Sequence, residues 1–370
     1  MYQIHHVLPS RSKADAGLVS AVEGLAFNQT GLGLTTHIHG ASSFPRWRRR
    51  DHIIKELGLS SSINHVLHTH GLWLSPSRVA RRVQRQKIPT VLAPHGMLDP
   101  WCLNRHRLFK KILLFANEYA TLQGTGCIQA LCKSELSSIK NLGITAPVAL
   151  IPNGIDLPDT NKQLKLEAPL WLKHGVPEGS PVLLYLGRFH TKKGISPLIK
   201  AWQKLQATNP QELWLVFAGF SDDGKFEESL KHLSIPRVIN IGPVFGVEKL
   251  SAYAHSSAFI LPSFSEGLPV SALEAMSWNL PCLLSKACNM PDAFRVGAAI
   301  EAEPDEDELL SSLNHFVDLL YNSPSTLCSM GKAGRHLVET EFGWEQVAKK
   351  TLHLYSWLLG LAERPEFVYI

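Results

Sequence analysis

The segment VLLYLGRFHTKKG at residues 182–194 sets the pattern for the whole chain. A short apolar run, typical of a buried strand, ends in a glycine and a basic turn, and a helical pattern follows over residues 195–206. The same succession of apolar run, turn and helical pattern continues on both sides of this segment. Strands that alternate with helices at this spacing predict parallel sheets with right-handed crossovers.

Working outward from this segment gives two sets of strands. We expect them at residues 2–8, 34–39, 63–69, 90–93, 127–131 and 148–151, and then at 182–187, 213–218, 238–241, 258–261 and 281–285. The stretch 153–181 is interrupted by prolines and glycines, and the chain ends in helical patterns over 305–321, 324–340 and 344–359. The expected domains are therefore residues 1–160 and 161–343, followed by a final segment, 344–370.

Length and composition agree with this organisation. The chain has 370 residues, 45% of them hydrophobic and 19% charged, which indicates a globular protein and excludes disorder as its main state. We find no run of 18 apolar residues and no basic segment followed by an apolar one at the start, so neither a membrane span nor a secretory signal is expected. The six cysteines include no C-x2-C pair, which favours reduced thiols in a cytoplasmic protein over a zinc or redox motif.

Charge is distributed unevenly along the chain. Residues 1–155 contain 18 Lys and Arg against 7 Asp and Glu, a balance of +11, and the remaining 19 basic and 25 acidic residues give −6. The basic residues cluster at 46–50, 78–87 and 105–111, the last within an amphipathic pattern at 104–122. A solvated basic face and attachment to an anionic membrane surface both remain open. Nucleic acid is not an expected partner, because no recognisable binding module accompanies the clusters.

The turn after the strand at 182–187 carries two cations. Arg188 offers a planar fork of donors and Lys193 a point charge, and the pair suits a diphosphate at the carboxyl end of the strand. The P-loop spacing is absent, and an ordinary surface loop is the alternative.

The segment PSFSEGLPVSALEAM at residues 262–276 is more specific. Pro269 suits the first turn of a helix, whose free amides form an anion site, and Gly267 leaves room for a ligand near the backbone. Glu266 and Glu274 would repel a phosphate, so they are better placed to accept hydrogen bonds from sugar hydroxyls. The alternative is a helix cap with surface carboxylates.

These residues carry a family resemblance. Glu266 and Glu274 form an E-x7-E motif which, together with the Arg188 and Lys193 turn, resembles the donor site of family 4 retaining glycosyltransferases of the GT-B fold. Further matching segments follow the family's order: HGLW at 70–73, PHGMLDPW at 94–101, IPNGID at 151–156 and FGW at 342–344. The first two of these resemble a bacterial exopolysaccharide-type subgroup. The resemblance implies two Rossmann-like domains that face each other across a cleft, with the last helix crossing back to the first domain.

The resemblance also implies roles on the donor side. Arg188 and Lys193 would hold the diphosphate, and Glu266 would accept from the transferred sugar. Glu274 would bind the ribose hydroxyls. The backbone of Gly267, Leu268 and Pro269 would assist Glu266, and the turn at Val244 would contact the base. Gly17 in the first loop would let the backbone approach the phosphates or the acceptor. The family commonly has two glycines in that loop, where this chain has Ala16 and Gly17.

The resemblance places His95, as a catalytic residue with Arg188, Lys193 and Glu266, near the anomeric centre across the cleft. On the acceptor side, His70 would line the cleft, and Trp73 and Trp101 would stack on an acceptor sugar, with core packing as the alternative for both tryptophans. The family commonly has Gly-x-Pro after the E-x7-E helix, where this chain has Asn279; asparagine also tolerates the left-handed conformation of a helix cap.

No separate carboxylate nucleophile stands out, so front-face substitution is expected, in which a leaving phosphate oxygen takes the acceptor's proton. No metal or other cofactor is expected, because Arg188 and Lys193 supply the positive charge. The one D-x-D sequence, at 305–307, is interpreted as a helix start. The partners implied are a nucleotide-diphospho sugar, with UDP-glucose or UDP-galactose favoured over GDP-mannose, and a glycan or lipid-linked glycan. A non-catalytic glycan- or sugar-nucleotide-binding protein of this fold remains the alternative.

Overall fold

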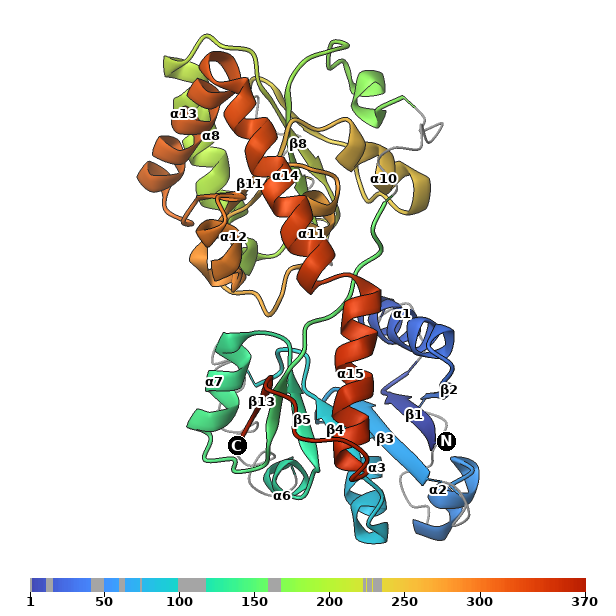
Figure 1. The fold of residues 1–370 in the computed structure, drawn as a ribbon. Coiled ribbons are helices and arrows are strands. Elements are labelled where there is room, and N and C mark those ends of the chain that lie inside the picture. The colour runs from blue at the N-terminus through green and yellow to red at the C-terminus, as the bar shows by residue number, and fades with distance from the viewer. Residues whose placement is uncertain are drawn as a thin grey trace. The chain divides into compact units, whose positions relative to one another are not determined.

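The computed structural model describes residues 2–10, 16–40, 50–59, 64–73, 75–98, 118–158, 168–221, 224, 228 and 235–370. These residues form two compact units, each with its own sheet (Figure 1). Unit 1 comprises Met1–Ile155 and Phe342–Ile370, and unit 2 comprises Asp156–Glu341. Unit 1 is therefore discontinuous in sequence, whereas unit 2 is one continuous stretch.

Over the described residues, the sheet of unit 1 has seven strands in the order β13-β6-β5-β4-β3-β1-β2. All neighbours are parallel except β13, which pairs antiparallel with β6 at one edge. The order reverses between β1 and β3, so the loops after these two strands diverge at that point. The strands are β1 (Tyr2–Leu8), β2 (Thr35–Gly40), β3 (Asn64–His70), β4 (Thr90–Ala93), β5 (Cys127–Ala130), β6 (Val148–Leu150) and β13 (Val368–Tyr369).

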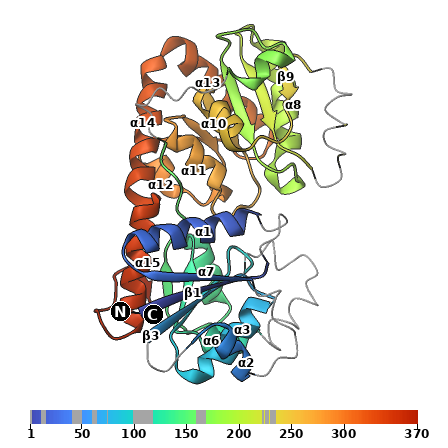
Figure 2. The same cartoon turned by 90° about the vertical axis from the view of Figure 1, so that its right-hand side faces the viewer.

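Alternate residues along these strands belong to two separate cores. Ile4 and Val66 pack in the core that contains helices α1 and α15, whereas Val7 and Leu67 pack in the core that contains α2 and α3. Successive side chains of a strand point to opposite faces, so helices cover both faces of the sheet (Figure 2). The helices of unit 1 are α1 (Ala16–Gly31), α2 (Arg50–Glu56), α3 (Ser75–Val83), α6 (Tyr119–Gln123), α7 (Lys133–Asn141) and α15 (Trp344–Leu358).

The return of the chain to unit 1 depends on Trp344, the first residue of α15. A Cβ atom on Gly24 of α1 would lie 2.3 Å from its indole ring, and one on Gly154 would lie 2.2 Å from it. Only glycine permits this approach on either side of the ring. The FGW segment therefore begins α15, as the sequence predicts, and anchors that helix against α1.

The sheet of unit 2 has six parallel strands in the order β12-β11-β10-β7-β8-β9. This is the doubly wound order in which the first strand, β7, lies beside the fourth, β10. The strands are β7 (Val182–Leu186), β8 (Trp214–Ala218), β9 (Val238–Asn240), β10 (Ala258–Leu261), β11 (Cys282–Leu284) and β12 (Ala299–Glu301). The helices are α8 (Ile195–Thr208), α10 (Gly246–Ala254), α11 (Val270–Ser277), α12 (Pro291–Arg295), α13 (Glu306–Asn322) and α14 (Pro324–Glu341).

The predicted strands and C-terminal helices lie within one to three residues of these bounds. The basic cluster at 105–111, all but Arg50 of the cluster at 46–50, most of the amphipathic pattern at 104–122, and Trp101 fall outside the described residues. Among the residues that the structure does describe, no helix is both long and apolar enough to span a bilayer. Their cysteines are free thiols, all buried except Cys328, which is exposed on α14.

Candidate functional site

Unit 2 presents its functional side chains where the strand order reverses. The loops after β7 and β10 leave the sheet there in different directions, and ligands of such sheets bind outside the carboxyl ends of the strands at that point. Lys193 lies on the first loop, in the short 3-10 turn Thr191–Lys193, and Glu266 lies on the second. Two segments 73 residues apart in sequence are thereby brought together.

Gly194 permits the contact between these loops. Its φ is +68°, in the left-handed region, and a Cβ atom at this position would lie 1.8 Å from the carbonyl oxygen of Pro262. Lys192 reinforces the contact, because its carbonyl accepts the backbone N–H of Phe264 at 2.7 Å. The glycine that ends the basic turn is therefore required by the approach of the second loop.

Lys193 and Glu266 form an ion pair at this point. Lys193 Nζ lies 2.6 Å from Glu266 Oε1, and Ser263 Oγ donates to the same oxygen at 2.6 Å. Glu266 is 7% exposed and the Lys193 side chain 16%. A carboxylate this deeply buried needs such partners, and the remaining exposure leaves the pair accessible to a ligand.

The backbone after Glu266 offers donors at the start of α11. Among the described residues, the N–H groups of Gly267 and Leu268 have no hydrogen-bond partner. Asn289 Nδ2 donates to the carbonyls of Glu266 and Gly267, which holds the loop in place. The expectation for Pro269 was wrong in detail: it precedes α11 as the N-cap, and proline has no N–H with which to assist a ligand.

Glu274 lies one helix turn further along, on α11. Its two oxygens accept from Lys249 Nζ at 2.6 Å and from the Tyr253 hydroxyl at 2.9 Å, both on α10. Burial, reinforced by the Glu274 charge, raises the pKa of Tyr253 well above its usual value, so this hydroxyl stays a donor. α10 thus orients the second carboxylate of the E-x7-E motif.

The other predicted residues of unit 2 lie along the same edge. Arg188 follows β7 with an exposed side chain, and Val244 is buried in the loop between β9 and α10. That loop is tied back by the Gly219 N–H, which donates to the Gly242 carbonyl at 2.9 Å.

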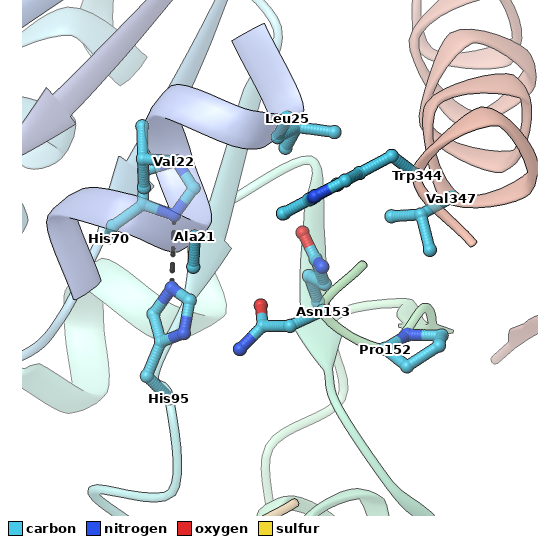
Figure 3. Close-up of a pocket in the computed structure, with 10 residues that line it drawn as sticks. Ala21, Val22, Leu25, His70, His95, Pro152, Asn153, Trp344 and Val347 are labelled. Atoms are coloured by element: carbon cyan, nitrogen blue, oxygen red, sulfur yellow. Dashed lines mark hydrogen bonds between the residues drawn. The ribbon is translucent and has the colours of Figure 1, made fainter. Parts of the chain in front are cut away.

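Unit 1 also places predicted residues at the carboxyl ends of its strands. His70 ends β3, and His95 follows β4 with φ +53°, in the left-handed region. His70 Nδ1 and His95 Nε2 are 3.0 Å apart, and both residues line a small pocket of unit 1 (Figure 3). The pocket is lined by Ala21, Val22, Leu25, His70, His95, Gln129, Pro152, Asn153, Trp344 and Val347.

Glu135 fixes the loop that carries His95. Its carboxylate accepts the backbone N–H of Gly96 at 2.6 Å and that of Leu131 at 2.8 Å. Trp73 is half-buried with φ +67° and packs against the core beside Leu72, in agreement with the packing alternative. Gly17 lies in the first turn of α1, as expected, and its surroundings fall outside the described residues.

The D-x-D sequence is a helix cap, as predicted. Asp305 precedes α13, and its Oδ1 accepts the N–H groups of Asp307 and Glu308 at 2.9 and 3.2 Å. Glu306 and Asp307 pair with Lys204 on α8. These carboxylates therefore serve the packing of α13 on α8.

Sequence reasoning missed the residues that hold the predicted ones in place. Most of them contact their partners across more than 20 positions, so no local spacing marks them: Glu135, Lys249, Tyr253, Asn289, and the partners of His70 described below. Ser263 is local, three residues before Glu266, and its role was missed although it lies within the 262–276 segment. For the partners of His70, the available signal was the high histidine content, 17 residues in the chain.

Comparisons with known proteins agree with this arrangement. A family model described as "Glycosyltransferase Family 4" matches residues 30–158, and one described as "Glycosyl transferases group 1" matches residues 172–336. The chain is 30% identical over 168 residues to an MMP alpha-(1->4)-mannosyltransferase of Mycolicibacterium hassiacum, a match that covers 44% of this chain and 40% of the relative. It is 25% identical over 316 residues to a glycogen synthase of Mycobacterium tuberculosis, covering 82% of this chain and 71% of the relative.

The fold has solved counterparts. Anabaena Alr3699/HepE, whose structure was determined in complex with UDP and glucose, superposes with a TM-score of 0.71 at 14% identity. The superposition covers 96% of this chain and all of that one. The two doubly wound units, the order of the motifs and the two family models together identify the chain as a glycosyltransferase of the family 4 type with the GT-B fold.

Proposed function

We propose that the protein is a retaining, metal-independent hexosyltransferase that moves a hexose from a nucleotide-diphospho sugar to a glycan or lipid-linked glycan. The observation that carries this proposal is the Lys193–Glu266 pair at the reversal of strand order, beside the unpartnered N–H groups of Gly267 and Leu268. The ammonium and the amides suit a diphosphate, and the carboxylate suits the hydroxyls of the attached sugar.

Two donors are proposed in order of preference. UDP-glucose or UDP-galactose comes first, supported by the UDP and glucose in the structure of the Anabaena counterpart. GDP-mannose comes second, supported by the name of the mannosyltransferase relative. Polysaccharide assembly, with an exopolysaccharide product, is the proposed setting, and it rests on the HGLW and PHGMLDPW segments.

The proposed mechanism is front-face substitution. The acceptor oxygen bonds to the anomeric carbon as the bond from that carbon to the phosphate oxygen breaks, and the leaving phosphate oxygen takes the acceptor's proton. Glu266 is already engaged by Lys193 and Ser263, which disfavours it as a covalent nucleophile. Lys193, Arg188 and the amides meet the negative charge that develops on the diphosphate.

We also propose that the basic part of unit 1 attaches the enzyme to an anionic surface at the inner face of the cell membrane. Among its described residues, Arg78 and Arg85 are exposed on α3 and the turn that follows it. Each basic residue near such a surface contributes about 1 kcal/mol of attraction.

Ligand-induced thermal stabilisation tests the donor proposal. The purified protein, with EDTA present, is heated with UDP-, GDP- and ADP-sugars, because a ligand that binds only the folded state raises Tm. We expect UDP-sugars to raise Tm and Lys193→Ala to abolish the shift. Lys286→Ala is the matched control, since its ammonium pairs with Glu301 on the exposed surface and its shift should equal that of the wild type.

Turnover then separates an enzyme from a binding protein. Release of UDP from the bound donor, with formation of a product that keeps the donor's anomeric configuration by NMR, supports the transferase. Binding without release at any acceptor concentration favours the non-catalytic glycan-binding alternative. A shift that appears only on addition of a divalent metal contradicts the metal-independent mechanism.

A further inference from the structure

A chain of side-chain hydrogen bonds runs through the interior of unit 1 and ends at His95. His95 Nε2 contacts His70 Nδ1 at 3.0 Å, and His70 Nε2 contacts His6 Nδ1 at 3.0 Å. His6 Nε2 contacts Gln29 Oε1 at 2.9 Å. These hydrogen bonds therefore join the loop after β4 to β3, β1 and α1. His6, His70 and Gln29 are each at most 2% exposed.

The far end of the chain fixes the orientation of the Gln29 amide. Gln29 Nε2 donates to Thr351 Oγ1 at 3.0 Å and to the Tyr355 hydroxyl at 3.2 Å, both on α15. The Thr351 hydroxyl proton is already committed to the Ala348 carbonyl at 2.9 Å, so Thr351 offers Gln29 only a lone pair. The NH2 group of Gln29 must therefore face α15, and its carbonyl oxygen must face His6.

This orientation propagates along the histidines. Gln29 Oε1 accepts only, so His6 donates from Nε2 and keeps a lone pair on Nδ1. His70 then donates from Nε2 to His6, and His95 donates from Nε2 to His70, because a neutral imidazole has one donor and one acceptor. Every ring carries its proton on Nε2, and His95 is left with a lone pair on Nδ1.

The rings are held neutral, as this arrangement requires. Burial lowers the pKa of His6 and of His95 to about 4, and burial together with the neighbouring rings lowers the pKa of His70 well below its usual value. At neutral pH each ring therefore carries a single proton.

A metal ion is the competing explanation for this cluster. Nitrogen atoms of His6, His68 and His70 lie within 4.8 Å of one another. The His68 and His70 rings, however, are stacked at 4.2 Å with 29° between their planes. Metal–nitrogen bonds are about 2.0–2.1 Å long and lie in the ring plane, so two stacked rings do not direct their lone pairs to one ion. The geometry favours the hydrogen-bonded chain.

We propose that Gln29, His6 and His70 are positioning residues that hold His95 in the Nε2–H form, so that its Nδ1 accepts a hydrogen bond from a substrate hydroxyl. The last step rests on the proposed function, whereas the proton positions rest on unit 1 alone. Among the described residues, Nδ1 of His95 has no hydrogen-bond partner. The left-handed backbone of His95 and the hydrogen bond from the Gly96 N–H to Glu135 orient the His95 ring toward His70.

Nitrogen-15 NMR of histidine-labelled protein tests the proton positions directly. Long-range correlations distinguish Nδ1–H from Nε2–H, and His95→Gln assigns the His95 signals. We expect His95, His70 and His6 in the Nε2–H form. Gln29→Met, which removes the amide at similar length, should bring in the Nδ1–H form of His95; Thr351→Val, which removes the hydroxyl that accepts from Gln29 and leaves the Gln29 amide in place, is the milder variant. An Nδ1–H His95 in the wild type, or an unchanged tautomer in both folded variants, overturns the proposal.

Kinetics test the consequence with a matched pair on one strand. His5 and His6 are adjacent, both buried, and each lies near two other polar side chains, but His5 contacts His39 and His65 instead of the chain to His95. We expect His6→Gln to lower kcat about 10-fold or more with little change in KM, and His5→Gln to stay within about 2-fold of the wild type. Equal effects of the two variants contradict a positioning role. The expected tautomers in a protein that transfers no sugar would support the positioning chain and reject the proposed function.

Discussion

The two units hold the polar side chains around their candidate site residues in different ways. In unit 1, histidines that are neutral and hydrogen-bonded lie within the sheet, as in the His6–His70–His95 chain. In unit 2, ammonium and carboxylate groups pair at the edge of the sheet, as in Lys193–Glu266 and Lys249–Glu274. The first arrangement depends on proton positions and the second on charge. The two units should therefore respond to different perturbations.

The largest effect should come from removing one charge in unit 2. Glu266→Gln keeps the shape of the side chain and an oxygen that accepts from Ser263, but it removes the anion that pairs with Lys193. We expect donor-dependent turnover to fall about 100-fold or more, because the variant disturbs both the sugar contact and the cation at the diphosphate. Steady-state kinetics measures the loss, and a variant within about 3-fold of the wild type would remove Glu266 from the site.

Replacing a closely packed glycine by alanine should destabilise the protein more in unit 2 than in unit 1. Gly194→Ala places a Cβ atom 1.8 Å from a backbone oxygen at a positive φ, so we expect a loss of about 3 kcal/mol. Gly154→Ala in unit 1 meets the Trp344 ring at 2.2 Å, but it adds no strain from a positive φ and its contact is with a side chain instead of the backbone, so it should lose less. Urea unfolding of both variants checks this order, and a Gly194→Ala protein as stable as the wild type would contradict the described loop contact.

Acid should destabilise unit 1 in particular. Burial lowers the pKa of His5 to about 3 and of His6 and His95 to about 4. The unfolded chain, with histidine pKa near 6.5, binds more protons than the folded chain between about pH 4 and 6.5. Stability therefore rises with pH across this window and is lost as pH falls.

Hydrogen exchange followed by peptide at pH 7 and pH 5, with intrinsic rates corrected, measures this effect. We expect protection to fall mainly in β1 and β3. An equal loss in the strands of unit 2 would show that the histidines are not its cause.

The smallest effect is expected at the Lys249–Glu274 pair. Its side chains are 31% and 23% exposed, and such pairs contribute about 1 kcal/mol or less. Lys249→Met should therefore leave Tm nearly unchanged, while nucleotide affinity falls because Glu274 is oriented by Tyr253 alone. Calorimetric titration with UDP measures the affinity, and Lys200→Met on α8 serves as the exposed control.

The same contrast explains how much the sequence predicted. Lys193, Glu266 and Glu274 were assigned to the donor site because each lies in a local motif that follows a strong strand pattern. Asn279 was expected in the left-handed region and has φ +59°. Strands β12 and β13 were not predicted: β12 has a single β-branched residue and ends in an exposed glutamate, and β13 has only two residues.

Local sequence patterns could not predict the hydrogen-bonded chain of histidines. His6 lies opposite His68 only through the register of β1 with β3, and Gln29 meets Thr351 across 322 positions. His65, His68 and His70 share one strand, but His65 contacts His5 whereas His68 and His70 lie beside His6, and only His70 was assigned to the site. Contacts of this kind follow from the assembled unit, so single segments do not contain them.

The discontinuity of unit 1 has a consequence for synthesis on the ribosome. Unit 2 is complete once residue 341 has emerged, so it can fold while the last segment is still being made. Unit 1 at that moment lacks α15 and β13, and the core that receives Val347, Leu354 and Tyr355 is open. Gln29 also lacks Thr351, the residue that orients it. Folding of the first part of the chain is therefore completed only after the last segment is made, and the proton arrangement at His95 is completed only when α15 docks.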